Sequence, residues 1–336
     1  MRRIIELVFL VAFIGIAGTT TAGFAQDKTR LEIGYMPILP VSQLFVGLEE
    51  GWIDAAGIEP DLVNFQNGPA MVQALLAGQL DIAYFGIGPA MVAKARGADI
   101  KVVASNIVEQ ISVIALGPLA DAFAEGEANE AFARFEAAEG RKAVIATFPL
   151  GSVPETVFSY WLQKRLALDP SAVELVYQGA AQVQQALLTG AVDGAAILEP
   201  VVAIVLEKVS DAKVVASGSE LFPGQPGAVL AVREGVIADH AEIVQALVAA
   251  HDRATQKLKE NPSAAAVDAQ KYVGGGRLDV AIVEQAVINS AHGWVADPNF
   301  IRDGATTMRD FQAETGTLGD AVDLDALFET RFYDAL

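Results

Sequence analysis

The 336-residue chain contains no cysteine. This absence excludes disulfides, thiolate metal ligands and a cysteine nucleophile. It also removes the residue that would carry a lipid after a signal segment, so we expect the mature protein to be free in its compartment. Export without disulfides is compatible with a Gram-negative periplasm.

Basic residues are also few. Lysine and arginine number 23 against 42 aspartate and glutamate residues, which gives a formal net charge of −19. Such a surface disfavours nucleic acid and anionic lipid as partners.

Catalytic and metal-binding patterns are missing as well. The three histidines, His240, His251 and His292, lie in the last third of the chain, where we expect solvated helix positions. The sequence has no metal-ligand spacing, nucleophile elbow or phosphate-binding glycine motif. We therefore expect a protein that is not an enzyme and has no catalytic residue, metal or cofactor.

Only one apolar run is long enough to suggest targeting. It extends from Leu7 to Ala17, follows two arginines and precedes Gly23-Phe24-Ala25, which has small residues at the two positions a signal peptidase reads. This pattern predicts a cleavable signal peptide over residues 1–25, with an uncleaved signal anchor as the alternative. Cleavage would remove two arginines and one glutamate, so the net charge would become −20.

Two stretches of the chain resemble each other. Residues 73–81 read QALLAGQLD and residues 185–193 read QALLTGAVD. Each pattern predicts a helix that ends at its glycine, Gly78 or Gly190, and a strand that follows. A repeat at this separation is too long for a solenoid and indicates two similar α/β lobes with a cleft between them.

Strand and helix patterns alternate until about residue 234, and only helical patterns follow. This order predicts parallel sheets covered by helices, with an all-helical tail that packs on the first lobe. We expect lobe 1 to comprise residues 26–115 and 231–336, and lobe 2 to comprise residues 116–230. The chain is expected to cross between lobes at 112–117 and 228–233. The predicted strands are 31–35, 60–65, 81–85, 101–105, 112–116, 142–147, 173–177, 194–198, 213–216 and 228–232.

The predicted strands run into turns rich in glycine, proline and serine that open helices. Ligands of open parallel sheets bind at this edge, and free N–H groups at helix starts can hold an anion without a basic side chain. One such turn is more often an ordinary helix cap, and Ser152 with Glu155 fits a capping box. The set of turns, converging from two lobes, favours a binding site. None of them contains arginine or lysine, which disfavours a doubly charged ligand. The turns are 40–43, 67–70, 86–90, 151–155, 179–182 and 199–200.

Several motifs together resemble the periplasmic substrate-binding proteins of ABC importers, in the group of taurine-, aliphatic-sulfonate- and nitrate-binding proteins and thiamine-pyrimidine-precursor binders. The resemblance covers nearly all of residues 30–336. The motifs are IGYMP at 33–37, EEGW at 49–52, GIEP at 57–60, the repeated LLxGxxD, GIGPA at 86–90, Gly151-Ser152 and DLDALF at 323–328.

The resemblance implies a type II periplasmic binding-protein fold. Two lobes, each a doubly wound and mostly parallel sheet, would be joined by two crossing strands and would close on one small molecule for delivery to a membrane permease. We expect a monomer. By similarity the ligand contacts are Pro37 to Leu39, Gln66, Gly86, Ile87, Gly88, Gly151, Ser152 and Glu199.

We assign roles to these candidates and to nearby aromatic residues. Ser152 and Gln66 would donate hydrogen bonds from their side chains, and the backbone N–H groups of Gly88 and Gly151 would hold an anionic oxygen. Glu199 would pair with a ligand amine. The aromatic residues expected to pack on the organic part of the ligand are Tyr35, Phe65 and Phe148.

Taurine or a related sulfonate is the first candidate ligand. Ile87 stands where sulfonate binders tend to have a hydroxyl residue, and residues 153–155 lack the hydroxyl and histidine side chains common there. A pyrimidine or thiamine precursor, another heterocycle or an organic acid therefore stays open. So do a sensory ligand-binding protein and, as a weaker alternative, an enzyme on the same fold.

Overall fold

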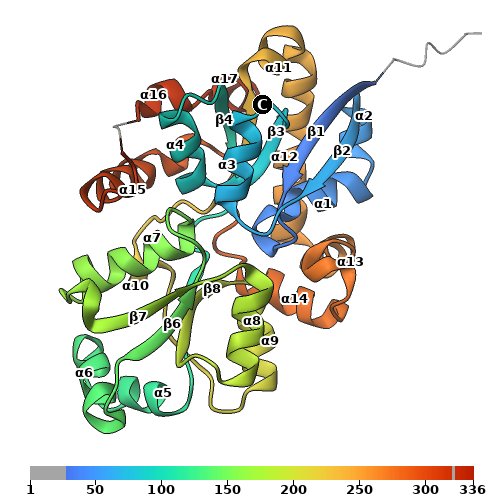
Figure 1. Cartoon of the computed structure of the whole chain (residues 1–336). Coiled ribbons are helices and arrows are strands. Elements are labelled where there is room, and N and C mark those ends of the chain that lie inside the picture. Colours follow the sequence, from blue (N-terminus) through green and yellow to red (C-terminus); the bar gives the residue numbers. More distant parts are fainter. Residues whose placement is uncertain (1–27, 320–321) are drawn as a thin grey trace, which may run out of the picture.

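The protein is described by a computed structural model that covers residues 28–319 and 322–336. Two lobes, each built around a five-stranded sheet, lie one above the other (Figure 1). The predicted signal segment lies outside the described residues. None of the helices in the described part of the chain is long and apolar enough to cross a membrane.

The sheet of lobe 1 has the strand order β2-β1-β3-β10-β4. Strand β10 is antiparallel to both of its neighbours, and the other four strands run in one direction. Its strands are β1 (Thr29–Tyr35), β2 (Ile58–Asn64), β3 (Ile82–Gly86), β4 (Ile100–Ser105) and β10 (Ala228–Arg233).

Lobe 2 repeats this plan with the order β7-β6-β8-β5-β9, and here β5 is the antiparallel strand. The two repeated segments, 73–81 and 185–193, lead into the third strand of each sheet, β3 and β8. The predicted two-lobe, mostly parallel α/β fold is thus confirmed. The strands of lobe 2 are β5 (Ile111–Ala115), β6 (Ala143–Thr147), β7 (Val173–Tyr177), β8 (Gly194–Leu198) and β9 (Lys213–Ser217).

Helices cover both sheets (Figure 1). In lobe 1 they are α1 (Ser42–Glu49), α2 (Trp52–Ala55), α3 (Gly68–Leu76) and α4 (Ile87–Ala95). In lobe 2 they are α5 (Gly117–Ala124), α6 (Ala128–Glu139), α7 (Val153–Tyr160), α8 (Ala180–Thr189), α9 (Val201–Lys208) and α10 (Gly218–Leu221). The tail holds α11 (Glu234–Asp239), α12 (Ala241–Glu260), α13 (Pro262–Gln270), α14 (Val280–Asn289), α15 (Arg302–Glu314), α16 (Leu324–Leu327) and α17 (Arg331–Asp334).

The predicted helix ends in the repeat are confirmed. Gly78 and Gly190 follow α3 and α8 with φ of 73° and 64°, the left-handed conformation that glycine adopts without strain. At the other end of α3, the Asn67 side chain accepts a hydrogen bond from the backbone of Ala70 at 2.9 Å. Local sequence therefore sets both ends of this helix.

The chain crosses between lobes at other residues than we expected. Strand β5 lies wholly in the sheet of lobe 2 and β10 wholly in that of lobe 1, so the expected boundaries at 115/116 and 230/231 are wrong by several residues. The crossings are the segments 106–110 and 222–227, which pair with each other through Val108 and Pro226. The signals that could have marked these points are the polar pair Glu109-Gln110 before β5 and the proline- and glycine-rich run 222–227 before β10.

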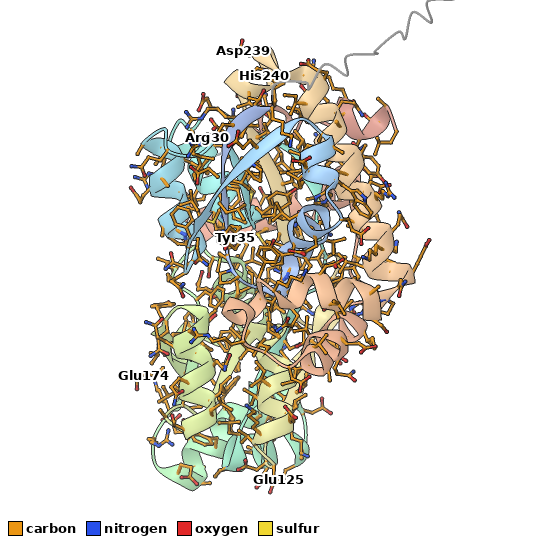
Figure 2. The ribbon with its side chains drawn as sticks, turned by 90° about the vertical axis from the view of Figure 1, so that its right-hand side faces the viewer. Arg30, Tyr35, Glu125, Glu174, Asp239 and His240 are labelled. Carbon is orange, nitrogen blue, oxygen red and sulfur yellow. The ribbon has the colours of Figure 1, made fainter. Side chains whose placement is uncertain are left out.

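The helical tail packs on lobe 1 as we expected, and it also contacts lobe 2. Helix α12 packs on α1 in lobe 1, while α14 packs on α9 and α15 on α7 in lobe 2. The Gln312 side chain donates a hydrogen bond to Thr156 Oγ1 at 3.0 Å, and both residues are buried. Figure 2 shows the length of the molecule, with His240 at the far end of lobe 1 and Glu125 at the far end of lobe 2.

Candidate functional site

Two adjoining cavities lie between the lobes. The larger, which we call the front cavity, has a volume of about 380 Å³ and the smaller, the inner chamber, about 30 Å³. Met36 and Ile38 line both cavities. The front cavity is lined by Met36, Pro37, Ile38, Asn64, Gln66, Ala180, Ala181, Gln184, Pro200, Val201, Gly274, Gly275, Arg277 and Leu278. The inner chamber is lined by Met36, Ile38, Gly68, Phe85, Gly86, Pro89, Gln110, Phe148, Ser152, Val153, Pro154, Leu198 and Ala228.

Two helices of lobe 2 begin at the front cavity. Ala180 and Ala181 form the first turn of α8, and Val201 begins α9. The first N–H groups of a helix have no partner within it and carry a partial positive charge. The predicted use of helix starts as polar groups of the cleft therefore has a geometric basis at α8, whereas the Ala203 N–H in the first turn of α9 already donates to the Glu199 carboxylate.

Arg277 adds a full positive charge to the same cavity. Its side chain is exposed and forms no ion pair or hydrogen bond with the residues that the structure describes. The lining of the front cavity contains no aspartate or glutamate. Sequence reasoning missed Arg277 because it considered only the turns that follow strands, whereas Arg277 comes from the helical tail.

The loop that carries Arg277 is fixed to lobe 1. Gly274, Gly275 and Gly276 have φ between 62° and 72°, so three successive residues take a conformation that side chains disfavour. The N–H of Gly274 donates to the carbonyl of Pro37 at 3.0 Å, which ties the loop to the segment after β1.

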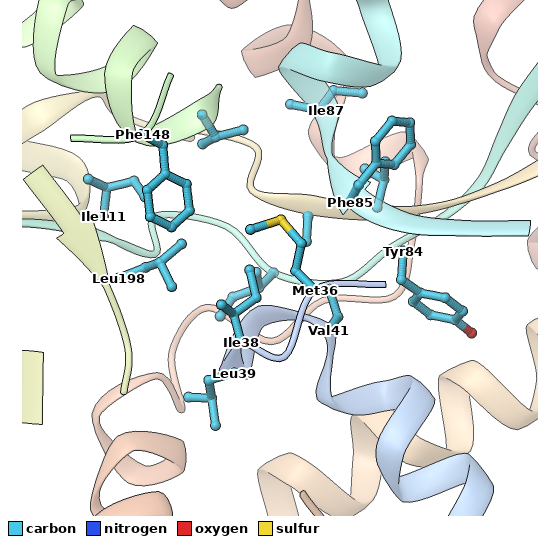
Figure 3. Close-up of a cluster of buried hydrophobic side chains, with 14 of the residues drawn as sticks. Met36, Ile38, Leu39, Val41, Tyr84, Phe85, Ile87, Ile111, Phe148 and Leu198 are labelled. Atoms are coloured by element: carbon cyan, nitrogen blue, oxygen red, sulfur yellow. The ribbon is translucent and has the colours of Figure 1, made fainter. Parts of the chain in front are cut away.

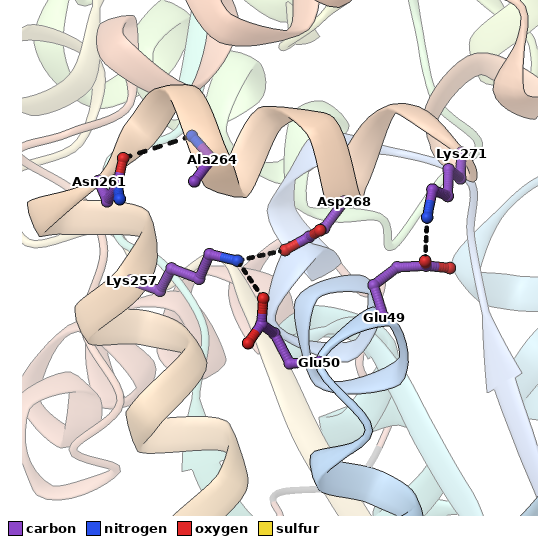
Figure 4. A network of polar contacts seen from close by, with 7 residues as sticks. All are labelled: Glu49, Glu50, Lys257, Asn261, Ala264, Asp268 and Lys271. Carbon is purple, nitrogen blue, oxygen red and sulfur yellow. Dashed lines mark hydrogen bonds and ion pairs between the residues drawn. The ribbon is translucent and has the colours of Figure 1, made fainter.

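Polar contacts hold the helices just before this loop (Figure 4). Lys257 Nζ lies 2.6 Å from Glu50 Oε1 and 2.6 Å from Asp268 Oδ2, so it joins α12 and α13 to the end of α1. Lys271 pairs with Glu49. Tyr272 donates to Glu49 at 2.8 Å and stacks on Phe45 with ring centroids 4.8 Å apart. These contacts therefore fix the helices that precede the loop carrying Arg277.

Six of the predicted site residues line these two cavities. Pro37 and Gln66 line the front cavity, Gly86, Phe148 and Ser152 line the inner chamber, and Ile38 lines both. The Ser152 side chain is 2% exposed, and its hydroxyl has no hydrogen-bond partner among the described residues.

The expected capping box at Ser152 and Glu155 is not formed. The Glu155 carboxylate instead accepts hydrogen bonds from the Gly151 N–H at 3.1 Å and from Ser159 Oγ at 3.0 Å. Burial raises the pKa of Glu155, although these hydrogen bonds partly oppose the shift. The carboxylate therefore occupies the Gly151 N–H that we expected to hold a ligand anion.

Gly88 and Gly151 form a contact between the lobes. A Cβ atom on Gly88 would lie 2.9 Å from the carbonyl oxygen of Gly151, so a larger residue at Gly88 would require a shift. Neither glycine lines the front cavity or the inner chamber. Their place in the structure indicates close packing rather than the predicted anion contact.

Glu199 faces the other side of the molecule. It is 8% exposed, accepts hydrogen bonds from Asn289 at 2.8 Å and from the Ala203 N–H at 3.0 Å, and its pKa is raised by burial. It lines a rear cavity of about 300 Å³ bounded by crossing residues 107–110 and the end of α14. Glu199 does not line the front cavity, so an amine of a ligand bound there would not meet its carboxylate.

The remaining candidates belong to the interior of lobe 1. Leu39 and Ile87 are fully buried, Phe65 is partly buried against the core, and Tyr35 packs edge-on against Phe45 with ring centroids 5.7 Å apart. None of the four lines the front cavity or the inner chamber.

The neighbours of these residues reach the cleft instead. Met36 lies between Phe148 and Leu198 of lobe 2 and Phe85 of lobe 1 (Figure 3). Side chains alternate along an extended chain, so Tyr35 and Met36 point to opposite sides. Our preference for aromatic residues selected the member of this pair that lines neither cavity, and the alternation was the signal that only one of the two could face the cleft.

One histidine position is also corrected. His251 is buried, its Nε2 lies 2.7 Å from the carbonyl oxygen of Ser105, and its ring stacks on Tyr84. Burial lowers the pKa of His251 to about 4, so its ring is neutral at neutral pH. Within residues 28–319 and 322–336 no group of three or more metal-binding side chains comes together.

Comparison with known proteins gives a consistent result. A protein of Brucella abortus (strain 2308), named only as a candidate binding protein, is 26% identical over 267 residues, which cover 78% of this chain and 76% of the relative. The alkanesulfonate-binding protein SsuA from Xanthomonas axonopodis pv. citri, solved bound to MOPS, has a TM-score of 0.72 at 19% identity and covers 90% of this chain and 99% of that one. The periplasmic nitrate-binding protein NrtA from Synechocystis PCC 6803 has a TM-score of 0.78 at 12% identity, over 92% and 88% of the two chains.

The family model described as the NMT1-like family matches residues 25–273, well over half of the chain. The solved structures support the fold, and the matched curated relative supports a binding role. The chain therefore belongs to the NMT1-like family, and its fold is that of the solved alkanesulfonate- and nitrate-binding proteins.

Proposed function

We propose that this protein is the periplasmic solute-binding component of an ABC importer and that its ligand is a small organic anion bound in the front cavity. The ligand would be captured as the lobes move about segments 106–110 and 222–227, and the protein would then deliver it to a membrane permease. Taurine or a related sulfonate is the first ligand class to test.

The position of Arg277 is the observation that carries the proposal. A guanidinium without an ion-pair partner among the described residues borders a cavity that contains no acidic side chain. The start of α8 borders the same cavity and favours negative charge, whereas at α9 the Glu199 carboxylate already accepts from the Ala203 N–H. A single sulfonate or carboxylate can accept hydrogen bonds from both sources, and bidentate arginine contacts suit such groups.

The cavity volume limits the ligand to a small molecule. About 380 Å³ is at the lower end of the range for small-molecule pockets. Taurine would bring its ammonium group into a cavity whose lining side chains offer only amide oxygens, from Asn64, Gln66 and Gln184. A sulfonate or carboxylate without an amine therefore agrees better with the lining than taurine does.

The direct test is isothermal titration calorimetry of the full chain with ethanesulfonate, taurine, nitrate, small carboxylates and a pyrimidine. We expect an anion to bind, and Arg277→Gln to weaken its binding by about 10- to 100-fold, because a charge-assisted hydrogen bond is lost. Arg165→Gln is the matched control, since Arg165 is an exposed arginine of lobe 2 that does not line the front cavity.

Two other outcomes would change the proposal. Binding of the pyrimidine alone would favour a heterocycle as the ligand and would remove Arg277 from its central role. Equal losses in the two arginine variants would show that only net charge matters. Permease and ATPase genes beside this one would favour transport, whereas a sensor kinase gene would favour a sensory role.

A further inference from the structure

The inner chamber combines an apolar lining with two unpartnered polar groups. Ser152 Oγ and Gln110 Oε1 are buried and make no hydrogen bond with the described residues. The other side chains that line the chamber are apolar, with Phe85, Phe148 and Leu198 among them. Buried polar atoms normally have partners, so these two atoms point to a polar group of the ligand.

The two polar groups come from different parts of the molecule. Ser152 precedes α7 in lobe 2, and Gln110 belongs to the first crossing segment. A Cβ atom on Gly227, in the second crossing segment, would lie 2.7 Å from the Gln110 amide carbon, so this glycine makes the space that the amide occupies. The position of Gln110 is thus set by packing between the two crossings.

The chamber volume sets the size of the group that can enter. About 30 Å³ exceeds the 10–15 Å³ or so that one water needs, so a hydroxyl fits and an aromatic ring does not. An ammonium group would meet no carboxylate among the lining residues, and burying an unpaired charge is costly. A hydroxyl can donate to Gln110 Oε1 and accept from Ser152 Oγ, so both groups would be satisfied.

We propose that the ligand is a short aliphatic anion that ends in a hydroxyl group, and that Gln110 and Ser152 select this hydroxyl in the inner chamber. The proposal rests on the proposed function, because it places the anionic head at Arg277 in the front cavity. Met36 lies at the junction of the two cavities, where its flexible side chain can move to admit the connecting methylene groups (Figure 3).

Calorimetry on the full chain tests the proposal with matched pairs of ligands. The pairs are 2-hydroxyethanesulfonate with ethanesulfonate, and 3-hydroxypropanesulfonate with propanesulfonate, and taurine is added as the amine analogue. We expect one hydroxylated ligand to bind about tenfold more tightly than its unsubstituted partner and than taurine, as the pairing of buried polar atoms would give.

Two substitutions test whether Ser152 and Gln110 cause the preference for the hydroxylated ligand. Ser152→Ala and, separately, the nearly isosteric Gln110→Met should each reduce the preference for the hydroxylated ligand to about threefold or less. The readout is the ratio of the two affinities measured on the same variant, so a change that affects both ligands equally leaves it unaltered. Ser171→Ala is the control, because Ser171 is an exposed serine of lobe 2 that does not line the chamber.

The outcomes separate the two proposals. Equal affinity of the wild type for hydroxylated and unsubstituted sulfonates would overturn the selection of a hydroxyl, while the anion proposal would stand. Failure of every anion to bind would overturn both. The comparison of ligands on the wild type decides the question even if one variant fails to fold.

Discussion

His251 is the residue whose environment departs furthest from what the sequence indicates. Its ring lies in the interior of lobe 1 against Tyr84 and the Ser105 carbonyl. Burial lowers its pKa to about 4, well below its usual value of 6.5. Between these two pH values the unfolded chain binds a proton at this residue and the folded chain does not. The group therefore stabilises the fold above about pH 6.5 and loses this contribution as the pH falls toward 4.

We expect this linkage to cost about 2 kcal/mol of unfolding free energy between pH 7.5 and pH 5.0. Urea denaturation of the wild type and of His251→Gln at both pH values measures it, since the variant keeps a hydrogen-bond donor but does not titrate. The stability difference between the two proteins should shrink by that amount at pH 5.0.

A difference measurement is needed because two carboxyl groups act in the opposite sense. Burial raises the pKa of Glu155 and of Glu199, so the contribution of each carboxyl group to the free energy of unfolding falls as the pH rises. A stability difference that does not change with pH would show that His251 has an ordinary pKa.

At the scale of elements, helix α15 is one of the two tail helices that pack on lobe 2. Gln312 on this helix donates to Thr156 in a buried contact, and Phe311 packs edge-on against Tyr160, with ring centroids 5.4 Å apart. Two residues after Gln312, Glu314 forms an exposed ion pair with Lys164 at 2.6 Å. Buried and exposed contacts on one helix thus allow a direct comparison.

We expect Gln312→Ala to lower the free energy of unfolding by about 1–3 kcal/mol, because it removes a buried hydrogen bond and leaves a gap. Glu314→Ala should change it by no more than about 0.5 kcal/mol, because exposed ion pairs contribute little. Chemical denaturation followed by circular dichroism gives both values. Similar small effects for both variants would mean that α15 adds little to the packing of the tail on lobe 2.

For the whole molecule, the two lobes are joined by more than their crossing segments. Helix α14 contacts α9, helix α15 contacts α7, and Glu199 of lobe 2 is hydrogen-bonded to Asn289 of the tail. The tail therefore packs against both lobes, and their stabilities should be coupled.

The three tryptophans report on this coupling. Trp52 lies in lobe 1, Trp161 in lobe 2, and Trp294 pairs with Ile107 of the first crossing segment. In three variants that each keep one tryptophan and replace the other two by phenylalanine, we expect fluorescence and circular dichroism to give the same unfolding midpoint. A lower midpoint for Trp161 than for circular dichroism in the same protein would show that lobe 2 unfolds separately.

Local and repeated patterns in the sequence determined the general plan of this protein. The paired segments 73–81 and 185–193 predicted two lobes, and Gly78 and Gly190 marked helix ends, because glycine conformation and hydrophobic periodicity act over a few residues. The motifs also placed the chain in its family. These features do not depend on how distant segments meet.

The tertiary structure decided which side chains share the cleft. Arg277 reaches the front cavity from the tail, Met36 takes the place expected for Tyr35, and Glu199 faces the rear cavity. Glu155 uses the N–H of Gly151 that we had assigned to a ligand. Each of these outcomes depends on the packing of segments far apart in the sequence or on the direction of one side chain. Local spacing shows that Tyr35 and Met36 point to opposite sides, but it encodes neither which of them faces the cleft nor which distant segments meet, so only the folded arrangement could reveal these outcomes.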